Sequence, residues 1–250
     1  MSFSLTEIEL KQALQESGCP LCWIGRNAAE RYIRHLLWES VNDGETRRHF
    51  LEGLGYCPEH TRMLAFRETE EYGDSLGVNI LYENLVSVVA GRLETLDLPK
   101  ELGSRERKLF SDKSRKQTGN LVPASACRVC QMADSSTQYA LKTLLEELDS
   151  APGDWQPRYA ASGGLCLAHL RQCMNAADHS PAPASFLHED ALSRLKRWQE
   201  GLQGYVRKHS WDLRDVPLTE NERQAWREVL AFFTGQPLSS FEGLEDRRSR

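Results

Sequence analysis

The sequence predicts an all-α protein, a helical bundle built from two duplicated helical repeats. Three observations support this fold class. A CxxC pair followed by a CxxH pair occurs twice along the 250-residue chain. The apolar residues between the pairs recur at i, i+3 and i+4, the period of a helix. The two halves also align at an almost constant offset, because 108 residues carry Cys19 onto Cys127 and 109 carry Cys57 onto Cys166.

The paired motifs supply eight candidate metal ligands. A single CxxC pair indicates little, but four pairs in register predict two closed sites, each with three thiolates and one imidazole. We expect each half of the chain to supply one complete site, which would staple its own helical repeat. The predicted ligands are Cys19, Cys22, Cys57 and His60 in the first half and Cys127, Cys130, Cys166 and His169 in the second.

Zinc is the metal that this ligand set favours, with two ions per chain. A Cys₃His set without a free position is typical of structural zinc. An iron–sulfur cluster is the main alternative, since clusters also use CxxC pairs. Thiol–disulfide chemistry is a third reading, although its CxxC motif normally follows a strand and the sequence predicts none.

The predicted helices follow the chain in order. The first extends from Trp23 to Val41, and proline after Cys19 and after Cys57 predicts that both cysteines are N-caps. Each repeat continues with a short return segment and a third helix, around residues 78–96 and 191–205, with Ser75 as a candidate cap. Thr219 and Glu222 form a predicted capping box, and the helix that follows should stop at Gly235.

These elements divide the chain into four predicted segments. Residues 1–98 form the first repeat and residues 127–210 the second. Residues 99–126 form a basic, flexible linker, with seven basic and three acidic residues between Lys100 and Lys116. Residues 211–250 contain a C-terminal helix and a disordered tail.

Composition and charge bear on the partners and the cellular compartment of the protein. The net charge of −5 does not favour a nucleic-acid partner, and no apolar run is long enough to span a membrane. The first 17 residues do not resemble a signal peptide, because four charged residues interrupt them. Six of the seven cysteines belong to the paired motifs, which suits a reducing compartment, so we expect a cytoplasmic protein.

The motifs also resemble those of an uncharacterised bacterial family of all-helical proteins with duplicated CPxC and GxCxxH motifs. The resemblance covers most of residues 10–210 and is carried by Gly18–Cys22, Gly55–His60 and the run Leu81-Tyr82-Glu83. The second copy departs from the family pattern, with Arg128 and Leu167 at the positions of the motif prolines. The resemblance implies metal binding, and it gives no information about an activity.

Three functions follow as hypotheses. The first is a non-enzymatic, metal-stapled scaffold that binds a protein partner, since the sequence has no phosphate-binding loop, GxSxG or HExxH motif. The second is an iron–sulfur or thiol-based redox or metal sensor. The third is an enzyme with an open metal site and Glu59 as its base, although Glu59 aligns with Ala168. Cys173, outside the motifs, is expected to be a buried apolar residue rather than a ligand.

Overall fold

The computed structural model describes residues 4–96, 121–176, 181–213 and 215–237. These residues form helices and no strand, which confirms the predicted all-α class. Most of the predicted linker and the predicted tail lie outside the described residues. No helix in the described part of the chain combines the length and the apolar character needed to cross a membrane.

The chain divides into two compact units, which cut across the two predicted repeats. Unit 1 comprises residues 1–26 and 135–250, and unit 2 comprises residues 27–134. Two long helices belong to both units: α2 (Pro20–His35) starts in unit 1, and α7 (Arg128–Ser150) starts in unit 2. The duplication of the sequence stays a prediction, as do the boundaries of its repeats.

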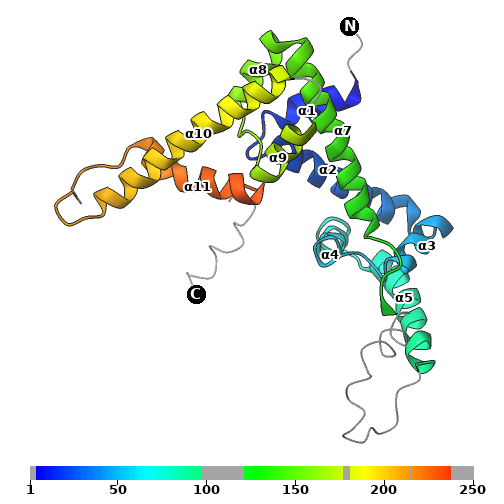
Figure 1. Ribbon diagram of the computed structural model, residues 1–250. Coiled ribbons are helices and arrows are strands. Elements are labelled where there is room, and N and C mark those ends of the chain that lie inside the picture. Colours follow the sequence, from blue (N-terminus) through cyan, green and yellow to red (C-terminus); the bar gives the residue numbers. More distant parts are fainter. Residues whose placement is uncertain (1–3, 97–120, 177–180, 214, 238–250) are drawn as a thin grey trace, which may run out of the picture. The chain divides into compact units, whose positions relative to one another are not determined.

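Unit 1 is built around an apolar core to which all of its described helices except α11 contribute. Besides parts of α2 and α7, it contains α1 (Leu5–Ala13), α8 (Pro152–Ala161), α9 (Leu167–Ala176), α10 (Pro181–Lys208) and α11 (Glu220–Thr234). Helices α10 and α11 run side by side (Figure 1) around a smaller cluster of Trp198, Ala225 and Phe232. The capping box of Thr219 and Glu222 is present at the start of α11, as predicted.

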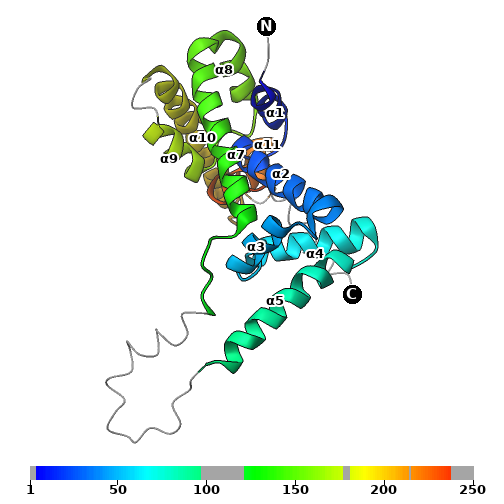
Figure 2. The same cartoon turned by 90° about the vertical axis from the view of Figure 1, so that its right-hand side faces the viewer.

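Unit 2 contains the rest of α2, a π-helical turn η1 (Leu36–Ser40), α3 (Gly44–Glu52), α4 (Pro58–Tyr72), α5 (Leu76–Glu94) and the start of α7. Helices α3, α4 and α5 lie together (Figure 2). Their core includes Ile33, Phe50, Leu64 and Leu81, each at most 1% exposed. Helix α2 and the π-helical turn η1 together cover most of the helix that the sequence predicts from Trp23 to Val41.

The cap of α5 differs from the prediction. Ser75 occupies the N-cap position, but its side chain makes no capping hydrogen bond. The buried Glu68 of α4 replaces it, because its carboxylate accepts the backbone N–H groups of Gly77 and Val78. A negative charge at the positive end of a helix is favourable, so Glu68 fixes the start of α5 against α4.

We predict that Glu68→Gln destabilises the protein by about 1–3 kcal/mol, because the amide cannot replace both acceptor oxygens. Glu70→Gln is the matched control, since Glu70 lies on the same helix and is exposed. Urea unfolding of both variants checks this. Equal unfolding free energies for the two variants would contradict the capping role.

Candidate metal centres

The first cluster lies within unit 1, where the N-termini of α2 and α9 meet. Cys19 and Cys166 immediately precede these helices, and Cys22 and His169 lie in their first turns. Nδ1 of His169 lies 3.4, 3.3 and 3.3 Å from the Sγ atoms of Cys19, Cys22 and Cys166. The Sγ atoms of Cys22 and Cys166 are 3.8 Å apart. Four donor atoms from two helix starts thus surround one point.

The second cluster repeats this arrangement within unit 2, where α4 and α7 begin. Cys57 is the N-cap of α4, as predicted, and His60 lies in its first turn. Nδ1 of His60 lies 3.2, 3.7 and 3.3 Å from the Sγ atoms of Cys57, Cys127 and Cys130. The Sγ atoms of Cys57 and Cys130 are 3.7 Å apart.

Both clusters have the dimensions of a tetrahedral site. Metal–sulfur bonds of about 2.3 Å and metal–nitrogen bonds of about 2.05 Å place two sulfurs about 3.8 Å apart, and sulfur and nitrogen about 3.6 Å apart. The observed distances lie close to these values. In each cluster all four donor atoms lie within 4.8 Å of one another. The donor sets therefore fit a metal ion without rearrangement.

All eight predicted residues are brought together, but the expectation that each half builds its own site is wrong. The CxxC pair of the first half clusters with the CxxH pair of the second, and the converse holds for the other cluster. The 21 residues of α2 and η1 rise about 30 Å, whereas the nine of α3 rise only about 14 Å. Helix α3 by itself therefore does not return the chain to the start of α2, and Cys57 lies beside the start of α7 instead.

Thiols that lie this close influence one another's ionisation. Hydrogen bonds from Cys19 and Cys22 lower the pKa of Cys166, which also accepts the backbone N–H of His169. The same contact with Cys166 raises the pKa of Cys22. Burial raises the pKa of Cys130 to about 12. A metal ion must displace the protons that the Cys22 and Cys130 thiols retain near neutral pH. Metal binding should therefore strengthen as the pH rises.

Close backbone contact shapes the loops that lead into the first cluster. A Cβ added at Gly163 would lie 2.5 Å from the backbone oxygen of Gly18, the residue before Cys19. Gly18 and Gly164 also adopt positive φ angles of 88° and 73°. Glycine is thus required where the chain approaching Cys19 meets the chain approaching Cys166. The sequence shows these glycines beside the motifs, but it does not show that they touch.

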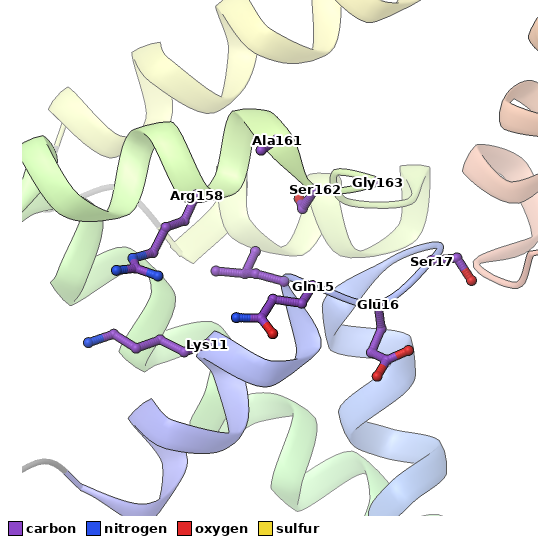
Figure 3. A pocket seen from close by; sticks show the side chains of 9 residues that line it. Lys11, Gln15, Glu16, Ser17, Arg158, Ala161, Ser162 and Gly163 are labelled. Atoms are coloured by element: carbon purple, nitrogen blue, oxygen red, sulfur yellow. The ribbon is translucent and has the colours of Figure 1, made fainter.

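A cavity of about 510 Å³ lies beside these loops and is lined by residues from α1, α8 and both loops (Figure 3). Two basic side chains, Lys11 and Arg158, approach its rim. Their charges are matched by acidic neighbours, because Lys11 binds Glu7 at 3.1 Å and Arg158 binds Asp154 at 2.8 Å. We assign no ligand to this cavity.

Cys173 and Glu59 lie outside both clusters. Cys173 is fully buried in the apolar core of unit 1, which confirms the expected packing role. Burial raises the pKa of its thiol to about 12. Glu59 is exposed in the first turn of α4.

The fold and the two clusters define an all-helical protein with two candidate Cys₃His metal centres. Residues 1–238 match the model of the family of unknown function DUF6062, and the chain belongs to this family. The chain is also 23% identical over 221 residues to an uncharacterized 23.9 kDa protein in the xynA 3'region of Caldicellulosiruptor sp. (strain Rt8B.4). The alignment covers 88% of this chain and 97% of that protein. No solved structure matches the chain.

We predict that Gly163→Ala disrupts the first cluster, because the new methyl group meets rigid backbone and something must shift. The expected loss of stability is about 1–3 kcal/mol. Gly153→Ala is the control in the same unit, since a Cβ there meets nothing within 4 Å. Thermal unfolding of both variants checks this, and a Gly163→Ala variant as stable as the control would refute it.

Proposed function

We propose that this protein is a non-enzymatic scaffold whose two units are each stapled by one structural zinc ion. The observation that carries the proposal is the composition and size of the two clusters. Three sulfurs and one nitrogen are ligands that structural zinc prefers. The distances between these donor atoms match those around a single tetrahedral ion. Four protein ligands leave no position for substrate or water.

The surroundings of the clusters support a structural role. Two cysteines of the first cluster, Cys19 and Cys166, are 3% exposed and belong to the apolar core of unit 1. Cys127 packs against the core of unit 2. Three thiolates and one Zn²⁺ carry a net charge of −1, which the positive ends of two converging helices offset. Without the ion, these helix starts would lose their common anchor.

A single ion accounts for the distances better than an iron–sulfur cluster. In a cluster the four protein ligands are divided among two or four iron atoms, so ligands of different irons lie farther apart than the ligands of one ion. The donor atoms here lie within 4.8 Å of one another. An iron–sulfur site would require both clusters to open.

A thiol-based sensor is the second candidate function. Cys22 and Cys166, and likewise Cys57 and Cys130, have sulfurs less than 4 Å apart. Oxidation of either pair by a two-electron oxidant, such as a peroxide, would form one disulfide, reduce the oxidant and release the metal. Zinc release by peroxide that is reversed by a thiol reductant would support this role.

The expected partner of the scaffold is another protein. Helix α11 exposes Trp226, Leu230 and Phe233, which are 43%, 42% and 61% exposed. Their i, i+4 and i+7 spacing places them on one face of the helix. Apolar side chains grouped in this way support a role in protein binding.

We predict two zinc ions per purified chain and one in Cys22→Ser. This variant should also lose more than about 4 kcal/mol of stability, the class of effect expected when a structural metal is removed. Elemental analysis and thermal unfolding give both readouts.

Cys173→Ala is the matched control, because it removes a buried cysteine that belongs to neither cluster. It should keep two zinc ions and lose only about 1 kcal/mol. The proposal fails if Cys22→Ser retains both ions and melts like the unmodified protein. Brown protein that contains iron and sulfide would reject zinc.

A further inference from the structure

The end of α11 lies directly against the first metal centre. Gly235 follows this helix, is buried and has a φ angle of +80°. A Cβ at this position would lie 2.5 Å from Sγ of Cys22 and 3.5 Å from Sγ of Cys166. Because a Cα–Cβ bond measures about 1.5 Å, the Cα of Gly235 lies within about 4 Å of the Cys22 sulfur. The backbone therefore occupies the space beside two of the ligands.

The residues after Gly235 pack against the chain just before α2. A Cβ at Gly18 would lie 2.9 Å from Cδ of Pro237, so the proline ring packs against the residue before Cys19. Thr234 holds the intervening turn, because its hydroxyl accepts the backbone N–H of Gln236 at 3.3 Å. We call Gly235–Pro237 the C-terminal cover.

The cover is anchored away from the metal centre. Phe232 packs on Trp198 of α10 with ring centroids 5.5 Å apart, and Glu228 accepts the indole N–H of Trp198. Leu170, the residue after His169, packs against the same small cluster. The position of the cover thus depends on α10, while α9 connects its anchor to a metal ligand.

The second centre is more open to solvent. Its three cysteines, Cys57, Cys127 and Cys130, are all partly exposed, and only His60 is buried. In the first centre two of the three cysteines are buried. The two sites therefore share one donor set but differ in access.

We propose that the C-terminal cover gates the first metal centre, so that its ion exchanges only after the end of α11 moves away. The second centre then exchanges first. This inference rests on the proposed function, because it concerns the regulation of those same metal sites. Coupling between two sites is reciprocal, so metal binding at the first centre also holds α11 in place.

The test follows zinc loss from the full-length, zinc-loaded protein in excess EDTA. Samples taken over time are treated briefly with N-ethylmaleimide, digested with trypsin and analysed by mass spectrometry. Cys57 is the only cysteine between Arg48 and Arg62, and Cys166 the only one between Arg158 and Arg171, so each peptide reports one centre. Zinc should leave in two phases, with Cys57 labelled in the fast phase and Cys166 in the slow one.

Two substitutions at Gly235 test the cover itself. Gly235→Ala and Gly235→Asn both place a Cβ against the Cys22 sulfur, and Asn also tolerates positive φ. Each should speed the slow phase on the order of tenfold, as expected when an overpacked contact is displaced. Gly73→Ala and Gly73→Asn are matched controls, because Gly73 has a φ of +63° and a Cβ there meets nothing within 4 Å. They should leave the slow phase unchanged.

The outcomes separate this inference from the proposed function. Two zinc ions lost in a single phase, with Cys57 and Cys166 labelled together, would overturn the gate and leave the scaffold intact. Labelling of Cys166 before Cys57 would also overturn the gate alone. An unchanged rate of the slow phase in the Gly235 variants would have the same consequence. Protein purified without zinc would overturn both the gate and the proposed function. If the Gly235 variants fail to fold, the order of labelling in the unmodified protein decides.

Discussion

The structure depends on the meeting of two helix N-termini at each cluster of three sulfurs and one imidazole. The sulfurs of Cys22 and Cys166, 144 residues apart, come within 3.8 Å, and those of Cys57 and Cys130, 73 residues apart, within 3.7 Å. Closing such long loops costs conformational entropy. A bound ion would offset that cost, and the positive helix ends would stabilise the thiolates around it.

The crossed arrangement of the ligands makes each unit depend on both halves of the chain. Helix α2 and the residue before it contribute two cysteines to the first cluster, and the helix contributes core residues such as Ile33 to unit 2. Helix α7 and the residue before it contribute two cysteines to the second cluster, and the helix contributes core residues such as Leu144 to unit 1. The two clusters still differ in their surroundings, because the backbone of Gly235 lies against the first and the three cysteines of the second are all partly exposed.

The sequence predicts much of this structure, because the determinants are local. Proline after Cys19 and Cys57 marks the helix starts, and the Thr219–Glu222 capping box marks another. The pairing of the motifs could not be predicted, because crossed and uncrossed sites use the same residues in the same number. The contact between Gly163 and Gly18, the cap provided by Glu68 and the cover at Gly235 join residues far apart in sequence, so periodicity carries no sign of them.

Counting zinc in two double variants tests the crossed pairing most directly. His60→Ala with Cys130→Ser damages a single site in the crossed arrangement, so one zinc ion per chain should remain. His60→Ala with Cys22→Ser damages both sites, and no zinc should remain. The reverse result, with one ion kept in the His60/Cys22 variant and none in the His60/Cys130 variant, would show that each half binds its own ion and would contradict this account.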